Sequence, residues 1–203
     1  ARNATAIARI AEDAGVQAIQ IEDQETPKKC GHTPGRRVVP LPDMIRRIEV
    51  ALDARRSRDF LVIARTDART GLGIDEAIAR GRAFAQAGAD VVFVESPESE
   101  DEFARVGQEL AGSGAWLIAN MVPSGRSPEL PAARLKAMGF ALAIWPGAAM
   151  TVACAAIDSA LAYLKANGTT AGCPVPAFDM NRLHDLVGFP DVWAFEKRFV
   201  ETP

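Results

Sequence analysis

Short apolar runs alternate with longer helical segments through most of the 203-residue chain. Five runs rich in Val, Ile, Leu and Phe are predicted strands, at residues 16–21, 60–64, 90–94, 116–119 and 140–145. Five predicted helices follow them in order, at residues 44–54, 74–87, 100–110, 132–138 and 148–166. Near-continuous apolar strands that alternate with helices indicate a parallel sheet covered by helices.

Two architectures fit this rhythm, an open doubly wound sheet and most of a (β/α)₈ barrel. No predicted strand is followed by a G-x-G-x-x-G or G-x-x-x-x-G-K-[ST] motif, which weakens the nucleotide-binding doubly wound alternative. We therefore predict an α/β fold of the TIM-barrel type over residues 1–168, comprising about five of eight βα units. The N-terminal strands are expected to be absent from this sequence.

The last part of the chain has a different composition. Residues 169–176 are rich in Gly, Pro and Thr, and residues 179–187 and 192–199 are predicted short helices. We expect residues 169–203 to form a linker and a C-terminal helical arm. This arm could pack on its own barrel or be exchanged between subunits.

Charge and composition exclude several classes of protein. The formal net charge of −3 provides no basic field for nucleic acid or for an acidic membrane surface. We expect no apolar run to reach the roughly 18 residues that a membrane-spanning helix needs. Three cysteines in a chain of this length do not suggest a disulfide framework. A reduced, cytoplasmic protein that binds neither nucleic acid nor membrane is the expectation.

Polar side chains end four consecutive predicted strands: Glu22, Arg65, Glu95 and Asn120. The carboxyl ends of parallel strands meet at one rim, where the sites of barrel enzymes form. Carboxylates there suit a divalent cation, and an arginine suits a substrate carboxylate. The simpler alternative is that strand ends are polar because they reach the surface.

The segment between the first strand and the next helix, residues 23–41, is far longer than a usual βα connection. It contains Pro27-Lys28-Lys29-Cys30-Gly31-His32, in which a cysteine lies beside basic side chains that favour its reactivity. We predict a lid over the rim. The alternative is a solvated basic loop, since Cys-x-His alone is too sparse for a zinc site.

These motifs resemble those of the isocitrate lyase / phosphoenolpyruvate mutase superfamily, particularly 2-methylisocitrate and 2,3-dimethylmalate lyases. The matching segments are Ile-Glu-Asp-Gln at 21–24, Pro-Lys-Lys-Cys-Gly-His at 27–32, Ala-Arg-Thr-Asp-Ala at 64–68, Ala-Asn-Met-Val at 119–122, Met-Gly-Phe at 138–140 and Val-Gly-Phe-Pro at 187–190. The resemblance implies a Mg²⁺-dependent (Mn²⁺ possible) carbon–carbon lyase that splits a 2-hydroxy di- or tricarboxylate. It also implies a barrel that assembles as a homotetramer.

The resemblance assigns roles to individual residues. It implies catalytic roles for Cys30, as the acid that protonates a carbanion, and for Lys28, His32 and Glu95. It implies substrate contacts for Gly31, Arg65 and Asn120, and contact between Glu22 and the metal through water. The direct aspartate ligands are expected upstream of this sequence.

Two other functions remain open from the sequence. Oxaloacetate decarboxylases and carboxyphosphonoenolpyruvate or phosphonate mutases of the same superfamily are one alternative. The presence of Cys30 argues against the decarboxylases and phosphonate mutases, because their chemistry requires no carbon acid on the lid, whereas the same features also resemble carboxyphosphonoenolpyruvate mutases and leave the substrate open. The other alternative is a non-catalytic barrel subunit that binds a dicarboxylate.

Overall fold

The computed structural model describes residues 2–33 and 35–199. Its parallel sheet contains β1 (Ala18–Glu22), β2 (Leu61–Thr66), β3 (Val91–Val94), β4 (Trp116–Asn120) and β5 (Leu142–Ile144). The strands are hydrogen-bonded in the order β1-β2-β3-β4-β5. Each strand therefore neighbours the next one along the chain, as in a (β/α) barrel. In a doubly wound sheet, by contrast, the order of the strands reverses at a switch point.

Helices join and follow the strands. They are α1 (Arg2–Asp13), α2 (Leu41–Ala54), α3 (Arg69–Leu72), α4 (Ile74–Gln86), α5 (Glu100–Glu109), α6 (Ala132–Ala137), α7 (Ala148–Asn167), α8 (Met180–Leu186) and α9 (Phe189–Phe199). A local signal sets the start of α5, where the Ser99 side chain caps the helix by accepting the Glu102 N–H at 3.1 Å. The predicted elements all occur, with ends that differ from the prediction by no more than three residues, and the short α3 was not predicted.

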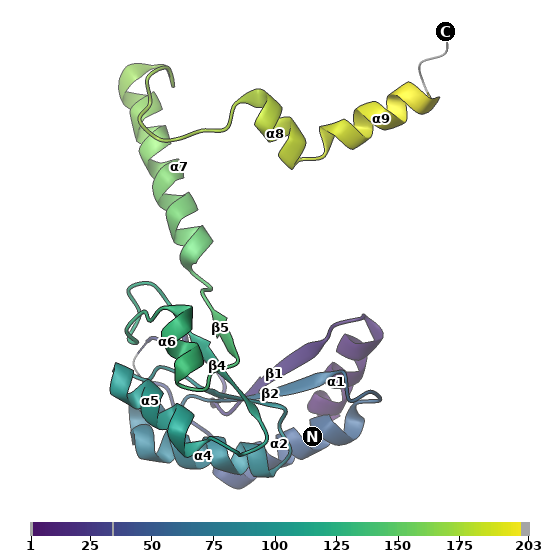
Figure 1. The fold of residues 1–203 in the computed structure, drawn as a ribbon, viewed down its shortest axis with the longest axis vertical. Helices are drawn as coiled ribbons and strands as arrows, with labels where there is room; N and C mark the ends of the chain where they lie inside the picture. The colour runs from purple at the N-terminus through teal and green to yellow at the C-terminus, as the bar shows by residue number, and fades with distance from the viewer. Residues whose placement is uncertain (1, 34, 200–203) are drawn as a thin grey trace. The chain divides into compact units, whose positions relative to one another are not determined.

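The main core lies between the helices and one face of the sheet. Met44 and Ile48 of α2 and Phe84 of α4 are fully buried and pack against Ala64 and other strand residues. Figure 1 shows α2, α4 and α5 along one side of the strands. The alternating side chains of the opposite face form a separate small cluster of Val91, Phe93 and Ile118. This second face carries the polar site described below.

The chain divides into two compact units, residues 1–148 and 149–203. The predicted boundary, after residue 168, lies at the end of α7 rather than at its beginning. None of α7, α8 and α9 contains a buried residue in the structure of residues 2–33 and 35–199.

Helix α7 also departs from the expectation about apolar runs. With 20 residues and a mean hydropathy of 1.3 in its most apolar window, it has the length and composition of a membrane span. Its only charged residues are Asp158 and Lys165, and much of its apolar character comes from alanine. Helices of water-soluble proteins meet the same criteria, so this property alone assigns no membrane.

Candidate active site

Alternation along the strands directs three predicted site residues to one face of the sheet. Val62 and Ala64 of β2 face the helix-covered side, so Ile63 and Arg65 face the other. Glu22 pairs in register with Arg65, which places both at the same level of the sheet. Asn120 ends β4 two residues beyond Ile118, on this same face. With Glu95, which directly follows β3, these residues form the rim (Glu22, Arg65, Glu95 and Asn120).

Arg65 is the centre of the rim. Its Nε and Nη2 donate to Asp67 Oδ2 and Oδ1 at 2.8 and 2.9 Å, and its Nη1 lies 3.4 Å from Glu95 Oε2. Its guanidinium is also 5.0 Å from the centre of the Phe93 ring, a cation–π contact. Burial would lower the pKa of Arg65, but the hydrogen bonds to Asp67 and the charges of Glu95, Asp67 and Glu22 raise it. A permanently charged, oriented guanidinium therefore faces the site.

Glu95 is fully buried and joins the rim to the lid. Asn120 Nδ2 donates to its carboxylate at 3.3 Å, and His32 Nε2 lies 3.2 Å from Oε1. His32 Nδ1 accepts the Arg126 backbone N–H at 3.0 Å, so the neutral ring carries its proton on Nε2, beside Glu95. Burial lowers the pKa of His32, Glu95 opposes this, and nearby arginines add to the lowering. Neutral imidazole is thus the favoured form.

The predicted lid is held down on the rim. Residues 25–37, here named the flap, leave the sheet through an antiparallel bridge between Gln24 and Val38. The Gln24 side chain accepts the Lys29 N–H at 2.9 Å and donates to the Lys29 carbonyl at 3.0 Å. Ser96 Oγ donates to the Gly31 carbonyl at 2.8 Å. Ser96 has a φ of 59°, an uncommon conformation for a residue other than glycine.

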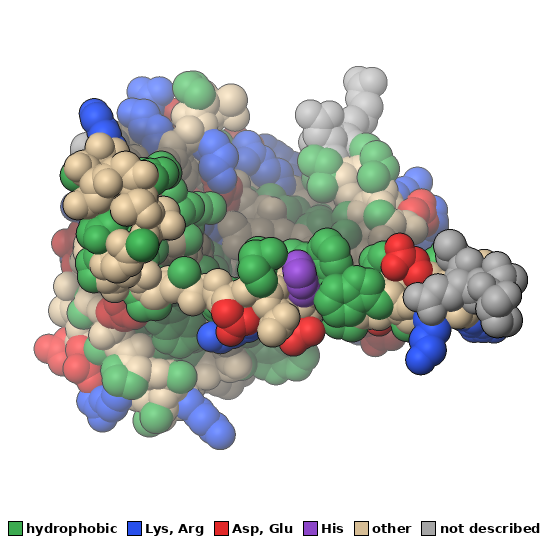
Figure 2. Space-filling model, turned by 90° about the horizontal axis from the view of Figure 1, so that it is seen from above, with side chains coloured by type: hydrophobic (Ala, Val, Ile, Leu, Met, Phe, Trp, Pro, Cys, Tyr) green, Lys and Arg blue, Asp and Glu red, His purple; other side chains and the backbone are tan. Residues whose placement is uncertain are grey.

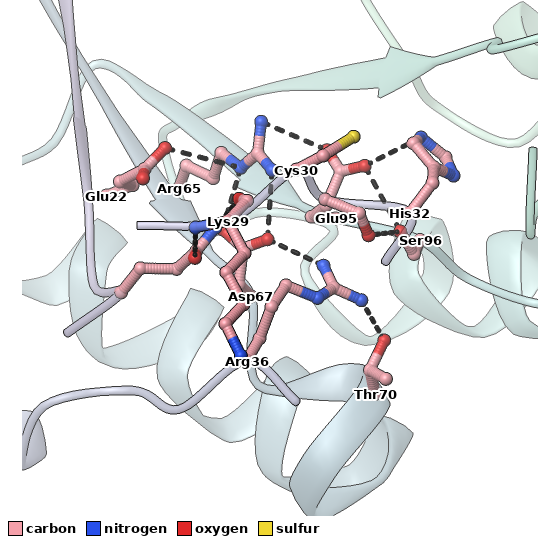
Figure 3. A network of polar contacts seen from close by, with 12 residues as sticks. Glu22, Lys29, Cys30, His32, Arg36, Arg65, Asp67, Thr70, Glu95 and Ser96 are labelled. Atoms are coloured by element: carbon pink, nitrogen blue, oxygen red, sulfur yellow. Dashed lines mark hydrogen bonds and ion pairs between the residues drawn. The ribbon is translucent and has the colours of Figure 1, made fainter. Parts of the chain in front are cut away.

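The flap tip touches Arg65 and Glu95 directly. A Cβ added at Gly31 would lie 2.5 Å from Arg65 Nη2 and 2.8 Å from Glu95 Oε1, so only glycine fits without displacement. Cys30 precedes Gly31 and has an exposed side chain. Figure 3 shows the Cys30 sulfur beside the Arg65–Glu95 pair in this view. The structure therefore brings the cysteine-bearing flap to the rim.

Lys28 binds Glu22 rather than the inner part of the site. Its Nζ lies 2.9 Å from both carboxylate oxygens of Glu22, and its side chain is 67% exposed. Figure 3 shows Glu22, Cys30, His32, Arg65 and Glu95 close together, and the contacts of Lys28 with Glu22 and of Asn120 with Glu95 add two more of the predicted residues. Their assigned roles are predictions that the geometry accommodates.

Four buried polar atoms of this network have no hydrogen-bond partner: Glu22 Oε1, His32 Nε2, Asn120 Oδ1 and Arg36 Nε. The first two lie close to Lys28 and Glu95, respectively, but are not aligned with them for hydrogen bonds. Buried polar groups are normally satisfied, so their concentration at the rim indicates a place for a polar ligand or water. The His32 Nε2 donor, together with the acceptors Glu22 Oε1 and Asn120 Oδ1, suits an oxyacid ligand.

The residues that hold the site were not singled out from the sequence. Arg36 Nη1 donates to Asp67 Oδ1 at 2.7 Å, and Asp23 Oδ1 accepts the Asp67 N–H at 2.9 Å. Burial raises the pKa of Asp23, whereas bonds from Asp67, Thr66 and Arg80 oppose the rise. Asp23, Gln24 and Asp67 lay within the quoted motifs, but sequence alone did not show their partners.

Comparison with known proteins gives a consistent family assignment. The chain is 43% identical over 188 residues to 2,3-dimethylmalate lyase of Eubacterium barkeri, covering 93% of this chain and 64% of that protein. It is 38% identical over 186 residues to a probable 2-methylisocitrate lyase of Corynebacterium glutamicum, covering 92% of this chain and 60% of that protein. The chain thus spans less than two thirds of the length of these relatives.

Solved structures agree on the fold. A crystal structure of 2,3-dimethylmalate lyase, a member of the PEP mutase/isocitrate lyase superfamily, matches with a TM-score of 0.84 and 35% identity, covering 96% of this chain and 64% of that one. Oxaloacetate acetylhydrolase in complex with 3,3-difluorooxalacetate matches with a TM-score of 0.85 and 33% identity, covering 96% and 65%. These matches confirm the predicted TIM-type α/β fold.

A sequence model of phosphoenolpyruvate phosphomutase covers residues 1–165. This match includes all five strands, the flap and α7 up to its last turn. The predicted superfamily is confirmed: the chain belongs to the phosphoenolpyruvate phosphomutase family.

Proposed function

We propose that the protein is a Mg²⁺-dependent carbon–carbon lyase that splits a 2-hydroxy di- or tricarboxylate of the 2-methylisocitrate or 2,3-dimethylmalate type. The observation that carries the proposal is the contact of Gly31 with Arg65 and Glu95, which brings Cys30 to the rim. A carboxylate-binding arginine and a proton-donating thiol are the two groups that such a cleavage needs at one place. The identities of 43% and 38% to two named lyases support the same reaction class.

Arg65 and Asn120 would orient the substrate. Because Asp67 accepts from Nε and Nη2 of Arg65, a substrate carboxylate would bind at Nη1, which lies 3.4 Å from Glu95 Oε2 and would be shared with that residue. Asn120 Oδ1, which is buried and unpaired, can accept a substrate hydroxyl proton in a hydrogen bond. These two contacts would hold the substrate beneath the flap, where water is excluded.

Cys30 would complete the cleavage. A base takes the proton of the 2-hydroxyl, the C2–O bond becomes a carbonyl, and the electrons of the C2–C3 bond pass to C3. The thiol of Cys30 then gives its proton to C3 and remains as thiolate, while the hydroxyl proton is available to restore the thiol. The products are pyruvate, or another 2-oxoacid, and a carboxylate. Glu95 and His32 would hold protons near the reacting atoms.

The residues of this chain would contact a magnesium ion only through a water molecule bound to it. Glu22 Oε1 is buried and lies 2.9 Å from Lys28 Nζ but accepts no hydrogen bond from the described residues, so it suits a metal-bound water. A relative of 28% identity is a phosphonopyruvate hydrolase in complex with oxalate and Mg²⁺. Residues 2–33 and 35–199 contain no group of three or more His, Cys, Asp or Glu that could hold the ion. We assign the direct ligands to residues outside this chain. When bound, Mg²⁺ supplies charge that favours the 2-alkoxide.

The second unit would serve assembly. Helices α7, α8 and α9 expose large apolar side chains, among them Ile157, Trp193 and Phe195. Figure 2 shows such green side chains on the viewed face. We propose that these helices pack against another copy of the chain in a homotetramer, which size-exclusion chromatography with light scattering would test.

Hydrolysis of oxaloacetate is the second candidate, because the fold matches oxaloacetate acetylhydrolase as closely as it matches the lyase. The deciding experiment uses the full-length protein, with a coupled assay for pyruvate and glyoxylate and a separate measurement of oxalate and acetate. The substrates are 2-methylisocitrate, 2,3-dimethylmalate, isocitrate and oxaloacetate, each with and without Mg²⁺. Pyruvate from one of the first two, dependent on Mg²⁺, supports the proposal. Oxalate and acetate from oxaloacetate alone, or no turnover at all, contradicts it.

A further inference from the structure

Asp67 is a buried carboxylate held by two arginines from different parts of the chain. Its Oδ1 accepts from Arg36 Nη1 at 2.7 Å and from Arg65 Nη2 at 2.9 Å, and its Oδ2 accepts from Arg65 Nε at 2.8 Å. The residue itself is 1% exposed. Figure 3 shows it between the two guanidinium groups. One carboxylate oxygen is therefore shared by the flap and the rim.

Arg36 fastens the C-terminal end of the flap. Its side chain is 1% exposed, and besides Asp67 it contacts the hydroxyl of Thr70 in α3. Arg37, the next residue, has a side chain that is 82% exposed and pairs only with half-exposed Glu25 among the described ion pairs. Of these two adjacent arginines, only Arg36 thus connects the flap to the interior.

A hydrogen bond to the buried Asp23 fixes the position of Asp67. Its backbone N–H donates to Asp23 Oδ1 at 2.9 Å, and Asp23 Oδ2 accepts from Thr66 Oγ1 at 2.8 Å and Arg80 Nη1 at 3.1 Å. Burial would raise the pKa of Asp67, but the bonds and charges of Arg65 and Arg36 lower it. Because the Asp67 carboxylate is fixed and ionised, it does not move with Arg36 or Arg65 when one of these side chains moves.

We propose that Asp67 is a positioning residue that couples the seating of the flap, through Arg36, to the orientation of Arg65. With Arg36 in place, Asp67 shares its charge between two cations and holds the Arg65 guanidinium by one edge, with Nη1 toward the site. Without Arg36, the whole charge of Asp67 acts on Arg65 and the flap loses its buried anchor. The role in substrate binding rests on the proposed function; the coupling of flap and rim does not.

Hydrogen–deuterium exchange of the full-length protein tests the coupling without any substrate. Asp67→Asn and Arg36→Met should each raise exchange in flap residues 25–37 roughly ten-fold, because each removes a charge-assisted hydrogen bond. Arg37→Met, the matched control, should leave it unchanged. The double variant Asp67→Asn/Arg36→Met should exchange no faster than the faster single variant. Additive effects, or an unchanged flap in Asp67→Asn, would overturn the proposal.

Two further readouts separate positioning from general destabilisation. Exchange in β3 and α4 should stay at wild-type levels in both variants, and an equal rise there would show a merely structural role. In the lyase assay, Asp67→Asn should raise KM by roughly ten-fold or more while kcat falls less, because Arg65 binds substrate. If no hydroxy acid is cleaved but the exchange pattern is found, the proposed function fails and the coupling stands. If cleavage is found and the exchange pattern is not, the coupling fails alone.

Discussion

The rim residues lie on or directly after buried strands, whereas the flap reaches the same site through a loop held by a few polar contacts. Glu22 and Arg65 are fixed by the register of β1 and β2, and the Glu95 N–H donates to Thr66 in the adjacent strand. The flap depends instead on contacts such as Gln24 with Lys29 and Arg36 with Asp67. Moving the rim would require disruption of the sheet, while moving the flap requires only that a few hydrogen bonds break.

The rim should be the more sensitive of the two regions to a change of donor geometry. Arg65→Lys keeps the charge but cannot reproduce the two parallel bonds to Asp67 together with the Nη1 contact. We expect kcat/KM to fall at least roughly 100-fold, from the loss of charge-assisted bonds. Steady-state kinetics would measure this, with Arg82→Lys on the exposed face of α4 as control. A fall no larger than in the control would remove Arg65 from the site.

A methyl group at the flap tip should separate the flap from the rim. Gly31→Ala would place its Cβ within 2.5 Å of Arg65 Nη2, at a cost of about 1–3 kcal/mol for seating the flap. We expect kcat/KM to fall by a factor of roughly 10–100 with little change in Tm. Gly71→Ala is the matched control, because its Cβ would make an ordinary 3.7 Å contact with the Arg36 carbonyl. Full activity in Gly31→Ala would refute the seated flap.

The N-terminal side of the flap depends on one amide side chain. Gln24→Met retains the approximate volume but removes both hydrogen bonds to the Lys29 backbone. The flap should open more readily by about 1–3 kcal/mol, with faster hydrogen–deuterium exchange at residues 28–32. Glu25→Gln, a change to a half-exposed neighbour, serves for comparison. Equal exchange in the two variants would show that Gln24 does not hold the flap.

Acidification should loosen the flap through His32. Its pKa is lowered in the folded protein, chiefly by burial, so the unfolded chain binds the proton more strongly. The stabilisation is therefore complete above the unfolded pKa of about 6.5 and is lost as the pH falls below it. The difference in unfolding free energy between wild type and His32→Gln, measured by urea denaturation, should shrink from pH 7.5 to 5.5. A growing difference would instead indicate a stabilising His32⁺–Glu95 pair.

The difference between rim and flap also explains what could be predicted from sequence. Strand ends in a parallel fold converge by topology, so Glu22, Arg65 and Asn120 followed from the apolar runs before them. The flap followed from its length and its Cys-Gly-His motif. The partners of Asp67 could not be predicted from the sequence, because Arg36 lies 31 residues away along the chain, at the C-terminal end of the flap. Side-chain contacts across such a distance depend on packing that no local pattern encodes.

The packing surface of α7 could not be predicted for a related reason. Helix α7 follows β5 as earlier helices follow their strands, and periodicity therefore placed it in the barrel. In the structure it buries no residue and belongs to the second compact unit. An alanine-rich helix has no marked apolar stripe, so its sequence does not identify the surface on which it packs.

The role of Cys30 as the carbon acid is tested most directly by comparing Cys30→Ser with Cys154→Ser in the full-length protein. A serine hydroxyl is far less acidic than a thiol, so Cys30→Ser should lower kcat by roughly 10²–10⁴-fold. Its affinity for substrate should stay within about three-fold of wild type, since binding is assigned to Arg65 and Asn120. Cys154→Ser should turn over normally. Near-normal kcat in Cys30→Ser would contradict the account.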